Sequence, residues 1–322
     1  MDEDPRIKKC NGCHTTGYNK DDHSFSEYGV SCEACHGPAS HHVAHKKMNK
    51  NLECKLCHQE HKEFKRDIIV SQKSSVCGQC HSRGTSTILD DTGKKTVFNF
   101  PLEYMPGMDI NSSFKPSTMR NDKKGKNWWG NGVSKNRHQE YADFSFSGHA
   151  KSLENLQTKS NPHGGKTNDE CLRCHSQDYR SAKEGEKPTL ETAKLGLTCI
   201  TCHEPHGIDR QIRSQASLDK KCTECHANNL PPKEEHFPCP TSEASCVGCH
   251  MPFIIKSGGD FSIRSHAFKI IPPEATQKYD MPSSCQNGSC HQDKSLQWAK
   301  ATFDSFYTES KHQTLAEHLK MR

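Results

Sequence analysis

One short cysteine pattern recurs along most of this chain and limits what the chain can fold into. At eight places two cysteines separated by two residues are followed immediately by a histidine, and a ninth copy has four residues between its cysteines. The copies, numbered here as motifs 1 to 9, use 18 of the 19 cysteines and leave Cys239 over. In chain order they are Cys10/Cys13/His14, Cys32/Cys35/His36, Cys54/Cys57/His58, Cys77/Cys80/His81, Cys171/Cys174/His175, Cys199/Cys202/His203, Cys222/Cys225/His226, Cys246/Cys249/His250 and the longer Cys285/Cys290/His291.

The pattern C-x-x-C-H is the attachment signature of haem c. Its two cysteine sulfurs form thioether bonds with the porphyrin, and the histidine becomes an axial ligand of the iron. Structural zinc sites, disulfide scaffolds and thioredoxin-like redox pairs also use paired cysteines, but none of them requires a histidine after every second cysteine. We therefore predict nine covalently bound haems c, with the extra residues of motif 9 looping out between its cysteines.

The composition agrees with a fold that is built around haem. Only 31% of the residues are hydrophobic and the mean hydropathy is −0.93, which leaves few side chains for a large core. Porphyrins would supply the missing apolar surface, so we expect the chain without haem not to fold. The sequence has no run of about 18 apolar residues, and we expect no transmembrane segment.

Each iron needs a second axial ligand, and the histidines outside the motifs are numerous enough to supply it. We expect mostly or wholly bis-histidine, low-spin haems of low potential, because methionine ligation would raise the potential. His61 and His206 each follow a motif histidine by three residues, and we expect them to bind the iron of a neighbouring haem. The candidate distal ligands are His42, His45, His61, His138, His149, His163, His206, His236 and His266, and the surface or alternative ligands are His23, His41, His312 and His318.

The spacing of the motifs predicts two haem clusters. We expect a four-haem cluster in residues 1–95 and a five-haem cluster in residues 167–294, joined by an aromatic and glycine-rich segment at 96–166 that has no haem motif. A helix is predicted at 295–322, where apolar residues recur every three or four positions.

The expected fold class is mainly α-helical with extensive coil around a haem core. Two short runs of β-forming residues flank a turn sequence and predict one short β-hairpin near 87–100. In the joining segment, Trp128 and Trp129 either pack against a haem edge or the cluster interface, or bind a sugar or a partner.

Five motifs lie within longer strings, which are Cys10-Asn-Gly-Cys-His-Thr-Thr-Gly-Tyr18, Val30-Ser-Cys-Glu-Ala-Cys-His-Gly-Pro38, Cys77-Gly-Gln-Cys-His-Ser-Arg83, Cys199-Ile-Thr-Cys-His-Glu-Pro-His-Gly207 and Cys246-Val-Gly-Cys-His-Met-Pro252. With these strings the chain resembles the multihaem c-type cytochromes, a group that includes tetrahaem cytochromes of nitrogen metabolism and decahaem electron-transfer proteins. The resemblance implies stacked and perpendicular haem pairs, short helices with much coil, and export before haem attachment. We therefore expect a periplasmic or extracellular location at the cell surface, with a signal peptide that is absent from the given chain.

The formal net charge of +5 describes the chain without its cofactor. Each ferric haem adds about one negative charge once its two propionates are counted, so the loaded protein is expected to be acidic. The charge of the loaded protein therefore does not support a basic nucleic-acid-binding protein. Cys239, between two prolines, is interpreted as a buried thiol, with an intermolecular disulfide or an extra ligand as alternatives.

These observations favour an electron-transfer protein without catalytic residues. Electrons would move along the haem chain and be exchanged with redox partner cytochromes or extracellular acceptors. Nine haems span more distance than a soluble shuttle needs, so self-association into an extracellular conductive filament is a further hypothesis. The alternative is a reductase of nitrite, hydroxylamine or a sulfur oxyanion, which would need one iron with an open position. A structural or metal-storage role is the third hypothesis, and covalent haem would argue against it.

Overall fold

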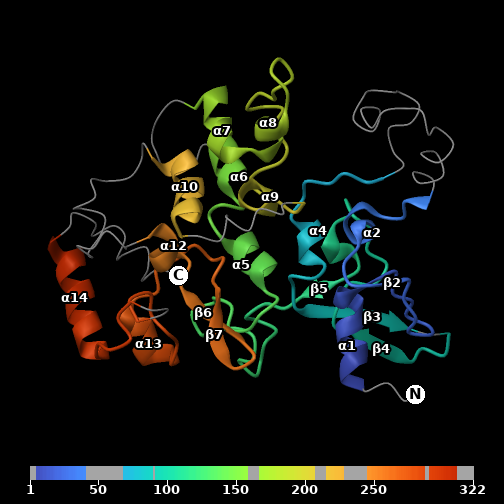
Figure 1. The fold of residues 1–322 in the computed structure, drawn as a ribbon, viewed down its shortest axis with the longest axis horizontal. Coiled ribbons are helices and arrows are strands. Elements are labelled where there is room, and N and C mark those ends of the chain that lie inside the picture. The colour runs from blue at the N-terminus through green and yellow to red at the C-terminus, as the bar shows by residue number, and fades with distance from the viewer. Residues whose placement is uncertain are drawn as a thin grey trace. The chain divides into compact units, whose positions relative to one another are not determined.

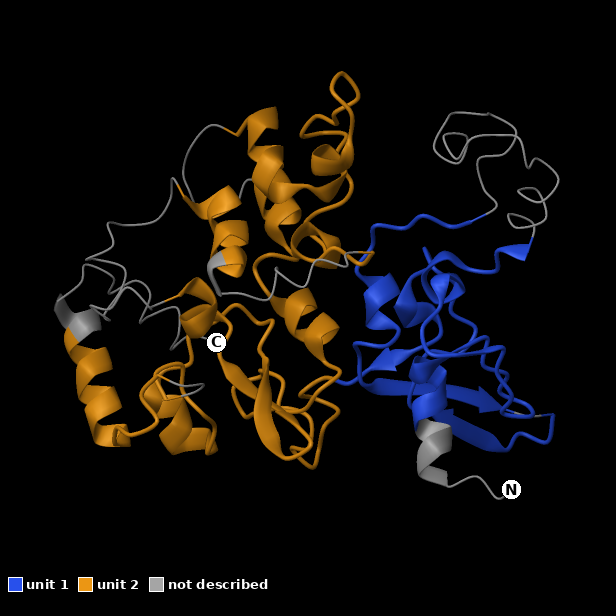
Figure 2. Cartoon of the chain, in the orientation of Figure 1, with its two compact units in different colours: residues 1–117 blue, residues 118–322 orange. Residues whose placement is uncertain are grey.

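The computed structural model describes seven stretches of the chain, which are residues 5–40, 68–89, 91–158, 167–206, 215–227, 245–286 and 290–309. The chain divides into two compact units, residues 1–117 and residues 118–322 (Figure 2). The division falls within the segment at 96–166 for which a connecting role was predicted. Motifs 1 to 4 belong to the first unit, and motifs 5 to 9 belong to the second.

The first unit combines short helices with small antiparallel sheets (Figure 1). Its helices are α1 (Pro5–His14), α2 (Cys32–His36), α4 (Ser75–Gly78) and the 3-10 turn η2 (Ile110–Ser112). Its strands are β1 (Thr15–Thr16), β2 (Glu27–Tyr28), β3 (Gly84–Leu89), β4 (Lys95–Phe98) and β5 (Lys115–Pro116).

The predicted hairpin is present in this unit. Strands β3 and β4 pair antiparallel, with Ser86 opposite Phe98 and Leu89 opposite Lys95, and β5 adds to the other edge of β3. The connecting turn contains Gly93 with a φ of +78°, a conformation that glycine adopts without steric cost.

The second unit is mostly helical. Its helices are α5 (Glu140–Phe146), α6 (Ser152–Gln157), the 3-10 turn η3 (Asp169–Cys171), α7 (Leu172–His175), α8 (Gln177–Ser181), α9 (Cys199–Cys202), α10 (Gln215–His226), α12 (Cys246–His250), α13 (Pro273–Tyr279) and α14 (Leu296–Glu309). A hairpin of β6 (Phe253–Ser257) and β7 (Asp260–Arg264) completes the unit. Short helices, coil and small sheets confirm the predicted fold class, and α14 lies within the region 295–322 for which a helix was predicted. Residues 310–322 lie outside the described part of the chain.

Side chains form an apolar core of their own in the second unit. Trp129, Val133, Ile254, Ile255 and Met281 are all buried in one cluster, and the indole Nε1–H of Trp129 donates to the carbonyl oxygen of Ile254 at 3.1 Å. This contact fastens the loop before α5 to the β6–β7 hairpin. Both Trp128 and Trp129 are only 4% exposed, so neither ring is available to bind a sugar.

A second cluster, Leu153, Leu156, Leu172, Tyr179 and Ala193, packs α6 against α7 and α8. Helices α6 and α7 therefore hold motif 5 next to the loop that precedes α6. Among the described residues, none of the helices is long and apolar enough to cross a membrane.

Candidate haem sites

Most of the described cysteine motifs lie on short helices, and this places their reactive groups together. Residues three apart on a helix lie on the same face, so both sulfurs of a C-x-x-C pair point the same way. Helices α1, α2, α7, α10 and α12 each end at the motif histidine. No disulfide joins the 16 cysteines that the structure describes. Motif 3 (Cys54, Cys57, His58) lies outside the described residues.

Motifs 4, 6 and 9 differ from this helical form. Helix α9 ends at Cys202, so His203 of motif 6 follows the helix, although its backbone N–H donates to the Cys199 carbonyl oxygen at 2.9 Å. Helix α4 ends at Gly78, so His81 follows the helix, although its backbone N–H still donates to the Cys77 carbonyl oxygen at 2.9 Å. In motif 9 neither Cys285 nor Cys290 belongs to a helix, because the longer spacing does not bring two cysteines onto one helical face. The common helical geometry therefore does not extend to His81, His203 and Cys290.

Several of the predicted haem-binding residues are exposed, on short helices or next to them. A porphyrin bonded to these residues would itself cover them, so their role in haem attachment stays a prediction. The exposed members of the described motifs are Cys10, His14, Cys32, His81, Cys202, His203, His226 and Cys290.

Hydrogen bonds fix the tautomer of three histidines so that Nε2 can bind iron. The Nδ1 atoms lie 2.7 Å from the Ile69 carbonyl oxygen for His36, 2.9 Å from that of Ser152 for His175, and 3.1 Å from that of Arg264 for His266. A carbonyl oxygen can only accept, so each Nδ1 carries the proton and each Nε2 keeps its lone pair. Histidines that bind metals use this arrangement, in which the second ring nitrogen donates to a carbonyl or carboxylate. The donor set therefore fits haem iron.

Two motif histidines each face a histidine that the sequence predicted as a distal ligand. The ring centroids of His149 and His226 are 5.9 Å apart, and those of His203 and His266 are 6.0 Å apart. A metal–imidazole bond is about 2 Å long, so two imidazoles on opposite sides of one metal ion have centroids roughly 6 Å apart. The spacing of both pairs fits an axial ligand pair.

The surroundings of His149 keep its ring neutral. Burial, followed by repulsion from His226, His250 and His175 when these are charged, lowers the pKa of His149 to about 4. Three motif histidines are therefore close enough to influence one buried imidazole. A neutral imidazole is the form that can bind a metal ion.

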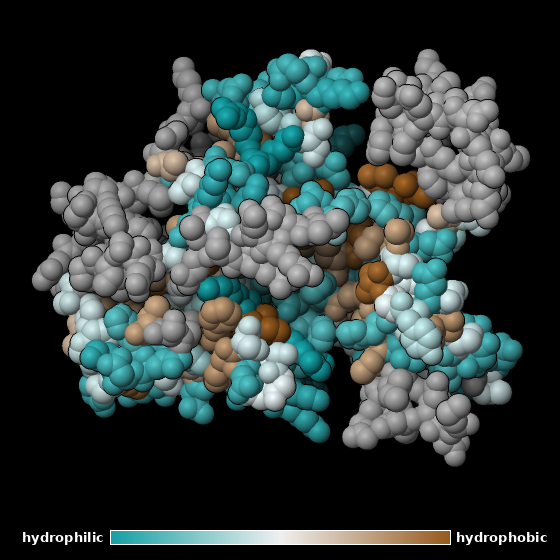
Figure 3. Space-filling model, in the orientation of Figure 1, coloured by the Kyte–Doolittle hydropathy of each residue, from teal (hydrophilic) through white to brown (hydrophobic). Residues whose placement is uncertain are grey.

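Exposed apolar side chains surround motif 2. Val30 is 60% exposed and Val70 is 75% exposed, and both lie next to residues that contact the motif. Ile69 and Met105 also approach Gly37, which directly follows the motif histidine. The face shown in Figure 3 is largely hydrophilic, with several separate hydrophobic patches. The apolar side chains around motif 2 fit the flat apolar surface of a porphyrin.

Different motifs lie next to each other inside each unit. In the first unit motif 1 contacts motif 4, because the Cys13 thiol donates to the Gln79 carbonyl oxygen and the Cys80 thiol donates to the Cys13 carbonyl oxygen, both at 3.7 Å. Motif 4 also contacts motif 2, because the Gln79 side chain donates to the Ala34 carbonyl oxygen at 2.8 Å.

In the second unit motif 7 contacts two other motifs at once. Its helix α10 packs against α7 of motif 5 and against α12 of motif 8, where the Val247 backbone N–H donates to Asp219 Oδ1 at 3.5 Å. Burial and the neighbouring Cys174 raise the pKa of Cys225, and Cys222 raises that of Cys246, so the cysteines of these motifs are close neighbours. Motif 8 in turn lies beside motif 9, since the Ser284 hydroxyl donates to the Cys249 carbonyl oxygen at 2.8 Å. The motifs are therefore adjacent in an order that differs from their order in the chain.

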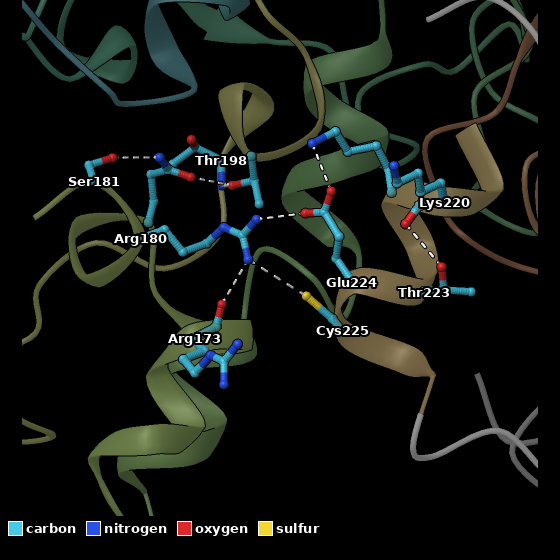
Figure 4. Close-up of polar contacts among 11 residues, drawn as sticks. Arg173, Arg180, Ser181, Thr198, Lys220, Thr223, Glu224 and Cys225 are labelled. Carbon is cyan, nitrogen blue, oxygen red and sulfur yellow. Dashed lines mark hydrogen bonds and ion pairs between the residues drawn. The ribbon is translucent and has the colours of Figure 1, made fainter. Parts of the chain in front are cut away.

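An arginine from α8 links the motifs around Cys225 (Figure 4). Arg180 donates from Nη1 to the Arg173 carbonyl oxygen at 2.9 Å, and Nη1 lies 4.0 Å from the Cys225 sulfur. Its Nη2 forms an ion pair with Glu224 at 2.9 Å, and Lys221 holds the other carboxylate oxygen of Glu224 at the same distance. Desolvation raises the pKa of Cys202 in motif 6, while the charges of Lys221 and Arg180 oppose this, which places motif 6 near the same group.

The remaining predicted ligands differ in their exposure and in their surroundings. His206 is 76% exposed at its side chain and lies 3.5 Å from Glu204, whereas His138 is half-buried with a φ of +65°. In motif 9 the ring of His291 lies 4.8 Å from that of Trp298 on α14. The predicted ligands outside the described residues are His42, His45, His61, His163 and His236. The sequence analysis missed Arg180 and Phe268, because neither carries a motif and both act through contacts with distant segments.

Comparisons with known proteins give a consistent assignment. The family model of cytochrome c554 and c-prime matches residues 1–37 and 135–204. The chain is 26% identical to the dissimilatory sulfite reductase MccA of Wolinella succinogenes over 23% of this chain and 15% of that protein. It is also 26% identical to the multiheme cytochrome MtrA of Shewanella baltica over 27% of this chain and 26% of that protein.

A solved structure matches much more of the chain. The outer cell wall cytochrome OcwA superposes with a TM-score of 0.71 at 30% identity, covering 94% of this chain and 64% of that one. The chain thus spans less than two thirds of each of these relatives. By its attachment motifs, its helix-and-coil fold and these relatives, the chain is similar to the multihaem c-type cytochromes.

Proposed function

We propose that the chain carries nine covalently bound haems c and conducts electrons between them. The observation that carries this proposal is the position of motif 7, whose helix α10 packs against α7 of motif 5 and α12 of motif 8. Haems bonded to the cysteines of these neighbouring helices would lie within electron-transfer distance of each other. Transfer needs no bond to form or break, because one haem loses the electron that its neighbour gains.

The protein residues would fix the distances and adjust the potential of each haem. In the second unit the proposed path runs between motifs 5, 7, 8 and 9, with motif 6 beside motif 7. In the first unit it joins motifs 1, 4 and 2. Arg180 would favour the reduced state of the haems near Cys225, since a positive charge attracts the additional electron.

The axial ligands proposed for two of these haems follow from the histidine pairs. His149 would bind the iron opposite His226, and His266 would bind the iron opposite His203. Both pairs make low-spin, low-potential bis-histidine haems. The other distal ligands stay as predicted from the sequence.

The location and partners proposed for the chain follow those of a surface electron-transfer protein. Its structural relative OcwA is an outer cell wall cytochrome. We place this chain outside the cytoplasm, where it would exchange electrons with partner cytochromes or extracellular acceptors. Self-association into filaments is a separate hypothesis, and negative-stain imaging of the purified protein at several concentrations tests it directly.

Reduction of a nitrogen or sulfur oxyanion is the second candidate function, favoured by the similarity to a sulfite reductase. Such a reaction needs an iron with an open position for the substrate. Electron transfer alone does not need one, because bis-histidine irons exchange electrons through the haem edge.

The deciding experiment combines haem quantification with electron paramagnetic resonance of the oxidised protein. Nine haems for each chain, all low-spin, are the expected result. A haem count below nine refutes the proposed stoichiometry. A high-spin signal equivalent to one iron for each chain, together with oxidation of the reduced protein by sulfite or nitrite, favours the reductase instead.

A further inference from the structure

One aromatic ring lies between the two proposed distal histidines. The ring of Phe268 is 4.3 Å from that of His149, with an angle of 62° between the planes. The same ring is 6.4 Å from that of His266, with an angle of 82°. Phe268 follows β7 and precedes α13 (Figure 1), whereas His149 comes from the loop before α6. The ring thus contacts imidazoles that approach from two distant parts of the second unit.

The backbone of Phe268 has an unusual conformation. Its φ is +54°, in the left-handed region that bulky side chains rarely occupy. Such a conformation persists only when the surrounding structure enforces it, and it is often found at functional sites.

Hydrogen bonds hold the turn that contains Phe268 at both of its ends. Before it, the Ser265 backbone N–H donates to the Pro252 carbonyl oxygen at 3.0 Å, and the Ser265 hydroxyl donates to Asp143 Oδ2 at 3.2 Å. After it, the Ile271 N–H donates to the Ser284 hydroxyl at 2.9 Å. The chain between these fixed points has to turn within a few residues, and the left-handed conformation of Phe268 makes that turn.

The two histidine pairs that flank Phe268 have different ring orientations. The planes of His149 and His226 are 85° apart, and those of His203 and His266 are 32° apart. His149 packs edge-on against Phe268, so the phenyl ring limits how far this imidazole can rotate.

We propose that Phe268 is a positioning residue shared by two haems. Its ring, presented by the left-handed turn, fixes the rotation of His149 opposite His226 and supports His266 opposite His203. This inference rests on the axial pairs of the proposed function. It adds that one side chain sets the ligand planes, and through them the electronic structure, of the haems on motifs 6 and 7.

The test compares three variants by electron paramagnetic resonance of the oxidised, haem-loaded protein. Low-spin ferric haems with nearly perpendicular imidazole planes give signals with a large maximum g value, whereas nearly parallel planes give rhombic signals. Phe268→Leu keeps an apolar side chain but removes the ring, and it should shift the large-g signal of the His149 pair. Phe268→Tyr keeps the ring and should retain the original signal. Phe261→Leu, a change at a 37% exposed phenylalanine in the same unit, is the matched control.

A spectrum of Phe268→Leu identical to that of Phe261→Leu would overturn the proposal. If Phe268→Leu loses haem, Phe268→Gly replaces it, because glycine accepts the left-handed backbone without steric cost. Retention of the original large-g signal in Phe268→Gly would overturn the proposal equally. Failure of the proposed axial pairs is recognised separately, because substitution of His149 itself would then leave the large-g signal in place.

Discussion

Replacement of His266 by alanine tests the axial assignment at one defined iron. His266 keeps its Nε2 lone pair because Nδ1 donates to the Arg264 carbonyl oxygen, and its ring lies 6.0 Å from that of His203. In the variant the iron held by motif 6 retains His203 and loses its second ligand. An iron with a single histidine ligand becomes high-spin and can bind an external molecule.

The size of the effect follows from the number of haems. One iron among nine changes, so the high-spin signal should account for about one ninth of the total iron. The ferrous protein should bind one molecule of carbon monoxide for each chain, where the parent protein binds none through this iron. The rhombic low-spin signal expected from ligand planes 32° apart should be lost, while the signal from the pair at 85° stays.

The assay uses spin quantification, carbon monoxide titration and haem content measured on the same sample. His206→Ala is the matched control among the described histidines, since this side chain is 76% exposed and lies beside Glu204. A His266→Ala protein with full haem content, no new high-spin iron and no carbon monoxide binding would refute the assignment. Loss of several low-spin signals together would instead show that His266 supports the fold as a whole.

Three further predictions concern the core, the motif contacts and the charge network. Trp129→Phe removes the indole N–H and leaves the Ile254 carbonyl oxygen unpaired in the core, so we expect the free energy of unfolding to fall by about 1–3 kcal/mol. Circular dichroism should show this as a lower melting temperature. Trp298→Phe, a change at a partly exposed tryptophan, should have a much smaller effect. The double variant Cys222→Ala/Cys225→Ala should lack one haem. Stopped-flow reduction should then show slower electron exchange between the haems of motifs 5 and 8. An unchanged rate would contradict the proposed path. Arg180→Ala should change the free energy of unfolding by at most about 1 kcal/mol, because its ion pair with Glu224 is partly exposed. Because the change removes a positive charge near Cys225, a potentiometric titration should show the reduction potential of a haem near Cys225 lowered by tens of millivolts.

Local features of the fold could be predicted because short stretches of sequence determine them. The resemblance to multihaem cytochromes implied short helices with much coil, and α1, α2 and α12 are short helices that each end at a motif histidine. The β-hairpin and the start of the C-terminal helix followed from periodicity and turn residues.

Contacts between distant segments could not be predicted in this way. The hydrogen bond from Trp129 to Ile254 joins residues 125 positions apart, and no local pattern marks either of them as a partner of the other. The sequence suggested His149 and His266 as ligands, but their facing histidines became evident only in the folded chain. Phe268 carried no signal at all, since its importance comes from a backbone conformation that depends on Asp143, Pro252 and Ser284.

The paired histidines lie far apart along the chain, and this helps to explain how so polar a chain can be ordered. In each proposed pair, the motif histidine and its distal partner come from different segments, as His226 of α10 and His149 before α6 do. A haem that is bonded to one segment by thioethers and to another by its iron therefore acts as a cross-link between them. Cross-links that close long loops reduce the entropy of the unfolded chain, so each haem stabilises the fold beyond the apolar surface that it buries. A chain with 31% hydrophobic residues can then be ordered mainly by its cofactors, and the side-chain core around Trp129 needs only to hold the turn that carries His266 and Phe268.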